Sequence, residues 1–117
     1  MSKTISKVRV FTKVAETAAT GSSNVIEAEG SEIILAAQVV DVSGTTPTLI
    51  FEVKYSVDGD TWFSAATPHT MTTITATPDP SLTTARFALL ARFARVEWAI
   101  GGTDTPTFTF TVDAVVH

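Results

Sequence analysis

Alternating apolar and polar residues recur along most of the chain, and this period of two is typical of β-strands that bury one face. The clearest run is 48–55, in which Leu49, Phe51 and Val53 alternate with mainly polar side chains. The run 107–114 alternates as regularly, with threonines on its polar face. No stretch combines helical spacing with the length and capping residues of a helix. The pattern therefore predicts an all-β chain.

Less regular runs predict further strands. In residues 7–14 three valines share one face and basic residues the other, although Phe11 interrupts the polar face. Residues 33–42 are apolar on both faces, which is typical of a central strand rather than an edge. Further candidates are 25–27, 70–77, 85–90 and 93–100, of which the last two are either separate strands or one bent strand.

Turn signals separate these runs. Asp58-Gly59 favours a type I turn with glycine in the left-handed region, which closes a hairpin onto residues 61–63. A Gly, Thr, Pro, Thr sequence precedes two of the strands, once in 44–48 and again in 102–107. We interpret this echo as the same turn chemistry used twice, because glycine frees φ and proline sets the entry into a strand.

The succession of short strands and turns predicts one domain, residues 1–117, folded as an antiparallel β-sandwich. We expect seven to eight strands in a jelly-roll or immunoglobulin-like topology. A chain of this length buries enough surface for one modest core. Residues 1–30 contain a Gly-Ser-rich stretch and no clear core pattern. They are a candidate extended arm or loop that orders on a neighbouring subunit.

Composition narrows the class of partner. Of the residues, 44% are hydrophobic and 17% are charged, which excludes a disordered chain. A net charge of −4 with only eight basic residues argues against nucleic acid and anionic membrane as partners. The chain has no cysteine, no apolar leader at its N-terminus, and no apolar run near the roughly 20 residues that span a bilayer. We therefore expect a soluble protein made in the cytoplasm.

Residues that carry catalysis are scarce. The conventional bases are His69, in a proline-flanked stretch that predicts a solvated loop, and His117, the last residue. Asp58 and Asp60 flank Gly59 and could ligate Ca²⁺, but their spacing is not that of an EF-hand. Aspartates in turns usually bond their own backbone. We predict no catalytic residue, no metal site, no cofactor and no enzymatic activity.

Aromatic residues offer binding contacts instead. Trp98 shares a face with Val96 and Ile100, which predicts burial in the core. Trp62 follows the predicted hairpin turn, where it either stacks on a sugar or fills the core. The candidate contacts for a partner protein or a glycan are Trp62, Asp58, Asp60 and Phe11.

The stretches 55–62 and 94–98 resemble the hairpin and the penultimate strand of discoidin-type (F5/8 type C) domains, which are sandwiches that bind carbohydrates and lipids. The chain is shorter than those domains and lacks a jelly-roll ending after Trp98. The resemblance implies a glycan-binding module, without carrying over the ligand-binding loops of that family.

A wider pattern is similar to small β-sandwich proteins from the structural modules of tailed bacteriophages. The segments that carry it are 43–48, the Ser-x-Asp-Gly-x-x-Trp hairpin at 56–62, 95–103 and 105–110. The resemblance implies a non-enzymatic virion protein, foremost a decoration or cement protein on the capsid exterior, with a neck or tail component as the alternative. The implied partners are the major capsid protein, other virion subunits and further copies of the chain, whose many weak contacts add up through avidity.

Overall fold

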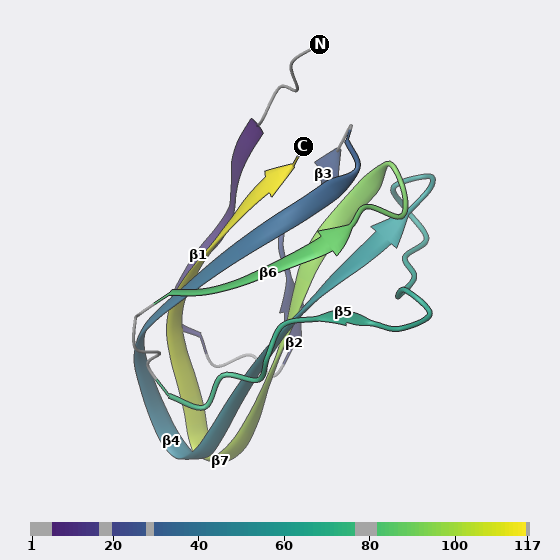
Figure 1. Cartoon of the computed structure of the whole chain (residues 1–117). Helices are drawn as coiled ribbons and strands as arrows, with labels where there is room; N and C mark the ends of the chain where they lie inside the picture. The colour runs from purple at the N-terminus through teal and green to yellow at the C-terminus, as the bar shows by residue number, and fades with distance from the viewer. Residues whose placement is uncertain (1–5, 17–19, 28–29, 77–81, 117) are drawn as a thin grey trace.

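The computed structural model describes residues 6–16, 20–27, 30–76 and 82–116, and the side chains of 6–16 and 82 lie outside this description. Its strands, shown in Figure 1, are β1 (Ser6–Glu16), β2 (Thr20–Ser22), β3 (Ile26–Glu27), β4 (Glu32–Ser56), β5 (His69–Thr70), β6 (Leu82–Ala88) and β7 (Phe93–Val116). Every pairing between them is antiparallel. The described residues contain no helix, and so none that is long and apolar enough to cross a membrane. The prediction of an all-β antiparallel fold is confirmed.

The sheet is organised by β4 and β7, which pair with each other along nearly their whole lengths. The sequence predicts four strands in these stretches, because the polar segments 43–47 and 101–106 predict loops. In the structure, both strands continue through these segments. Each predicted pair of strands is therefore one long, bent strand.

Both strands bend where the two Gly, Thr, Pro, Thr sequences meet, and we call residues 43–47 and 101–106 the corner. Gly44 and Gly102 have φ angles of 103° and 120°, in the left-handed region that favours glycine. A Cβ on Gly102 would lie 2.8 Å from a backbone carbonyl oxygen of the opposite strand, so a larger residue does not fit without movement. The two echoed sequences thus form one shared bend instead of two separate loops.

The corner divides the sheet into two halves that curl toward each other as a half-barrel (Figure 1). In the first half, residues 32–42 of β4 and 107–116 of β7 lie between β6 and β1. In the second half, residues 48–56 of β4 and 93–101 of β7 lie between β5 on one side and β2 and β3 on the other. We call the end of the half-barrel opposite the corner the open end.

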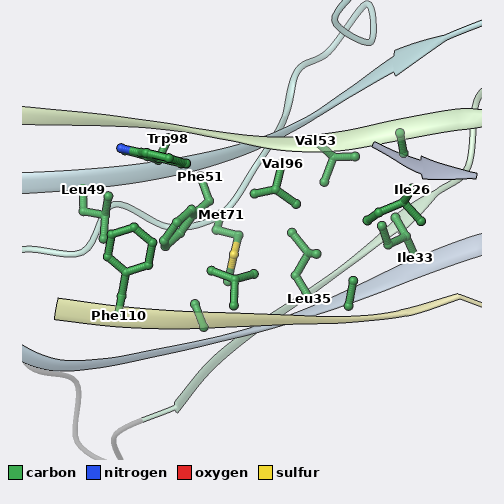
Figure 2. Close-up of a cluster of buried hydrophobic side chains, with 14 of the residues drawn as sticks. Ile26, Ile33, Leu35, Leu49, Phe51, Val53, Met71, Val96, Trp98 and Phe110 are labelled. Atoms are coloured by element: carbon green, nitrogen blue, oxygen red, sulfur yellow. The ribbon is translucent and has the colours of Figure 1, made fainter. Parts of the chain in front are cut away.

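The core fills the space between the halves, whose inward side chains face each other (Figure 2). The ring of Phe110 in the first half lies against those of Phe51 and Trp98 in the second, with centroids 5.2 Å and 5.9 Å away. Alternate positions of both long strands are buried, as their period of two predicts. Burial of Trp98, which is 5% exposed, is confirmed.

Several strand boundaries differ from the predicted ones. The run 33–42 is central, as predicted, because it lies between β6 and β7, but its outer face is open and Val40 on it is 58% exposed. The predicted strand 70–77 is limited to β5 and a single bridge between Ile74 and Leu49. Residues 85–90 and 93–100 belong to separate strands, β6 and the first part of β7.

The N-terminal segment pairs with β7 of the same chain through β1, β2 and β3. The short strand predicted at 25–27 is present as β3. The ladder of β1 has two shifts of register, between Arg9 and Phe11 and between Lys13 and Glu16. Binding of this segment to a neighbouring subunit stays a prediction.

Candidate functional site

Asp58 builds the turn at the open end. Its oxygen Oδ1 accepts hydrogen bonds from the backbone N–H groups of Asp60 and Thr61, at 2.8 and 2.9 Å, and from the Ser56 hydroxyl at 2.9 Å. These bonds, led by the one from Thr61, lower the pKa of Asp58 to about 2. Gly59 follows with a φ of 80°. The predicted turn is confirmed, and Oδ1 of Asp58 accepts its hydrogen bonds within that turn.

The hairpin that follows the turn is short. Among the predicted residues 61–63, Phe63 pairs back with Tyr55 through two backbone hydrogen bonds of 2.9 and 3.0 Å. Asp60 is exposed on the turn. Within the described part of the chain, no group of three or more His, Asp or Glu side chains is placed to hold a metal ion. The hairpin is thus fixed by one bridge and by the Asp58 turn.

Trp62 packs against charged residues on the outer face of the second half. The Arg95 guanidinium lies over its ring, 4.4 Å from the centroid. Nε of Arg95 also donates to Oε2 of Glu97 at 2.9 Å, and Nη2 forms an ion pair with the same oxygen at 2.8 Å. The other oxygen of Glu97, Oε1, lies 3.3 Å from Nζ of Lys54. These four residues form the Arg95 cluster, whose charged side chains are only 24–30% exposed.

Two hollows open beside Glu97 on the same face. The larger, which we call the β2 hollow, has a volume of about 220 Å³ and is lined by Thr20, Gly21, Ser22, Arg95 and Glu97. The smaller, of about 130 Å³, is lined by Thr20, Ile50, Glu52, Glu97, Trp98 and Ala99. Glu52 lies directly opposite Glu97 in the sheet. Its Oε2 is buried without a hydrogen-bond partner among the described residues.

β2 can lie against β7 because residue 21 is glycine. A Cβ at this position would lie 1.9 Å from Cζ2 of Trp98, so any larger residue would collide with the indole. With glycine there, Ser22 pairs with Glu97 and Thr20 with Ala99. Thr20, Gly21 and Ser22 of β2 therefore line the β2 hollow together with Arg95 and Glu97 of β7.

A buried tyrosine joins the two halves of the sheet near the open end. The Tyr55 hydroxyl donates to the carbonyl oxygen of Ala88 in β6 at 2.9 Å, and it lies 2.7 Å from Nδ1 of His69 in β5. Because the single hydroxyl proton is donated to Ala88, the hydroxyl accepts from His69, and Nδ1 carries a hydrogen. Burial raises the pKa of Tyr55 to about 12.

His69 completes this contact between the halves. Its ring stacks on Phe87 of β6 with the centroids 4.8 Å apart and the planes at 8°. The prediction of a solvated loop histidine is wrong, because His69 lies in β5 and packs between Tyr55 and Phe87. Both neighbours are distant in the sequence, and no local pattern indicates the contact. His117 lies outside the described residues.

Exposed hydrophobic side chains gather at the open end. Val25 precedes β3, Val57 is in the turn after β4, Phe63 pairs beside Tyr55, and Leu90 lies between β6 and β7. All of them are between 41% and 74% exposed. Nearby, Arg92 bonds Glu27 at 2.6 Å and lies over the ring of Phe93. The open end thus exposes four hydrophobic side chains, and the nearby Arg92 and Glu27 are paired with each other.

Of the four residues predicted as contacts, three lie together and one lies in the other half of the sheet. Asp58, Asp60 and Trp62 lie together on the hairpin at the open end. The backbone of Phe11 pairs with Val112 in the first half, and the side chain of Phe11 lies outside the described residues.

Sequence reasoning missed the partners of Trp62 and the hydroxyls of β2. Arg95 and Glu97 alternate with buried residues, which places them on one outer face. That spacing contains no information on which strands lie beside them. The contact with Trp62 depends on how the hairpin after the Asp58 turn packs, and the nearness of Thr20 and Ser22 depends on the register of β2 against β7.

No known protein family matches the chain, and no curated protein or solved structure is significantly similar to it.

Proposed function

We propose that the chain is a non-enzymatic structural subunit of a bacteriophage particle, foremost a decoration or cement protein that binds the capsid exterior in many copies. The observation that carries the proposal is the gathering of exposed hydrophobic side chains at the open end. Covering such a surface with another protein removes apolar area from water. The resemblance to phage sandwich proteins supplies the partner, which is the major capsid protein or another virion subunit.

The charges around the open end support a protein partner. Interface centres are depleted in unpaired charge. Here Arg92 is paired with Glu27 and the carboxylate of Asp58 accepts bonds within its own turn, while Asp60 is exposed on that turn. The molecule is also elongated, with extents of 49 × 30 × 23 Å, so one end can bind a shell while the corner points away from it. Many copies on a symmetric shell hold together even when each contact is weak.

We also infer that the half-barrel is a form of β-sandwich with jelly-roll or immunoglobulin-like topology. Supporting this, its two halves face each other across one core, and β4 and β7 contribute a stretch to each half. Counted in this way, the two layers contain nine strand stretches, or eight if β2 and β3, which follow each other along the same edge of β7, count as one. The protein is made in the host cytoplasm and is located in the virion, where copies lie beside one another.

The test is binding of the purified chain to undecorated capsids. We expect saturable, stoichiometric binding that raises the melting temperature of the capsid. The double variant Val57→Ser, Leu90→Ser should weaken binding at least about tenfold, because it removes apolar area from the centre of the contact. Val40→Ser, which alters a valine on the first half that is 58% exposed, is the matched control and should bind normally.

Two results would overturn this function. If the open-end variant and the control bound capsids with equal affinity, the open end would not be the contact surface. Binding to isolated necks or tails without binding to heads would place the protein in that part of the virion and exclude decoration of the capsid.

A further inference from the structure

We infer that the β2 hollow binds a single neutral sugar ring. This site lies on the outer face of the second half, none of the exposed hydrophobic residues of the open end lines it, and it does not depend on the proposed role in a virion. The hollow is formed by β2, which supplies hydroxyls, and by the first part of β7, which supplies Arg95 and Glu97.

The polar groups of the hollow match those of a sugar. Arg95 has five N–H donors, of which Nε bonds Glu97 and Nη2 forms an ion pair with the same carboxylate, so donors remain for a ligand. Glu97 keeps acceptor capacity on Oε1, which contacts Lys54 alone among the described residues. The exposed hydroxyls of Thr20 and Ser22 both donate and accept. Neighbouring hydroxyls on a sugar ring need such a mixture of donors and acceptors.

The charges favour a neutral ligand. Two carboxylates, of Glu52 and Glu97, are balanced by the two cations of Lys54 and Arg95, so the formal charge of the surface beside the hollow is zero. A phosphate or carboxylate ligand would meet the carboxylate of Glu97, and an ammonium ligand would meet the guanidinium of Arg95. A polyhydroxylated ring avoids both repulsions.

The site is ordered before a ligand arrives. Trp62 supports the Arg95 guanidinium, and the hydrogen bond and ion pair to Glu97 hold it in place. Groups already held in place lose little side-chain entropy when they bind. The hollow, at about 220 Å³, is smaller than the roughly 300 Å³ at which pockets for drug-sized ligands begin, and therefore suits one ring. We expect a dissociation constant of about 1 mM or weaker, which multiple copies would strengthen by avidity.

The experiment is an NMR titration of the ¹⁵N-labelled full chain with the methyl glycosides of glucose, galactose, mannose and N-acetylglucosamine, to about 100 mM. We expect saturable shifts of the amides of Thr20–Ser22 and Arg95–Glu97 with at least one of them. Sorbitol, an acyclic polyol, is the control ligand and should give no saturable shift.

Two variants locate the site, and a third controls for the loss of an arginine. Arg95→Gln should raise the dissociation constant at least about tenfold, and Ser22→Ala should raise it severalfold. Arg92→Gln removes an arginine that likewise bonds a glutamate and lies over an aromatic ring, but it is not part of the hollow. It should change the constant by less than about twofold.

The inference is overturned if no glycoside gives saturable shifts, if sorbitol gives the same shifts, or if Arg95→Gln binds as tightly as the wild type. Because Ser22 is an exposed edge residue, its alanine variant keeps the test decisive even if Arg95→Gln fails to fold. Binding to capsids is measured separately at the open end, so failure of either function is distinguishable from failure of the other.

Discussion

Replacing Tyr55 with phenylalanine removes one oxygen and tests how the two halves of the sheet are held together. The change leaves the carbonyl of Ala88 and Nδ1 of His69 without their shared partner, while the ring itself stays packed. A lost hydrogen bond costs about 1 kcal/mol, and a buried group left unpaired costs about 1–3 kcal/mol. Because His69 is only partly buried, water can replace its bond. We expect a loss of about 2 kcal/mol, which for a domain of this size lowers the melting temperature by roughly 6–12 °C.

The assay is urea denaturation followed by tryptophan fluorescence, with an unchanged slope expected if both states keep their compactness. His69→Phe is the companion variant, because it keeps a ring against Phe87 and removes only the bond to Tyr55. In a double-mutant cycle the two changes should couple by about 1 kcal/mol. A loss below about 0.3 kcal/mol in Tyr55→Phe, or additive effects in the cycle, would refute the reasoning.

The same hydroxyl predicts a dependence on alkaline pH. Burial raises the pKa of Tyr55 to about 12, so above the ordinary value of about 10 the unfolded chain loses a proton that the folded chain retains. Stability is therefore complete below about pH 10 and falls by at most about 1.4 kcal/mol per pH unit up to about pH 12. Tyr55 is the only tyrosine, so its absorbance change near 295 nm reports the ionisation directly. A midpoint near 10 in the folded protein would contradict the buried environment.

Three further changes have defined outcomes. Gly21→Ala should lower the free energy of unfolding, measured by urea denaturation, by about 1–3 kcal/mol and alter the emission of Trp98, because the new Cβ meets the indole. Unchanged stability would show that β2 does not pack against Trp98. Because the pKa of Asp58 is lowered to about 2, its contribution to the free energy of unfolding is complete above about pH 4 and is lost as the pH falls toward 2. Asp58→Asn should flatten this acid dependence of stability in denaturation curves. An unaltered dependence would rule out the turn as its source. Glu52→Gln should raise the free energy of unfolding by about 0.5 kcal/mol, because it relieves like charges directly opposite Glu97, and a destabilised variant would contradict this repulsion.

The strands and the core follow from the sequence because their signal is local. Side chains along 48–55 and 107–114 alternate, and the apolar members are buried in the structure. The bent strands are not predictable in this way. Glycine, threonine and proline in the corner produce the same local pattern as a loop, and the strands continue only because the two echoed sequences pair with each other across more than fifty residues.

The candidate site likewise contains some contacts that are local in the sequence and others that join distant strands. The Asp58 turn is predictable, since all its bonds are within three residues of the aspartate. The Arg95 cluster and the bond between Tyr55 and His69 depend on which strands become neighbours. Register between strands distant in the chain is set by the whole fold, so residue spacing alone does not indicate these contacts.

Hydrogen exchange of the protein on and off the capsid tests the central claim most directly, because it reports which backbone segments become covered. We predict that binding slows exchange in 57–63 and 89–92 at the open end and leaves the corner, residues 43–47 and 101–106, unchanged. Slower exchange at the corner with none at the open end would contradict the account.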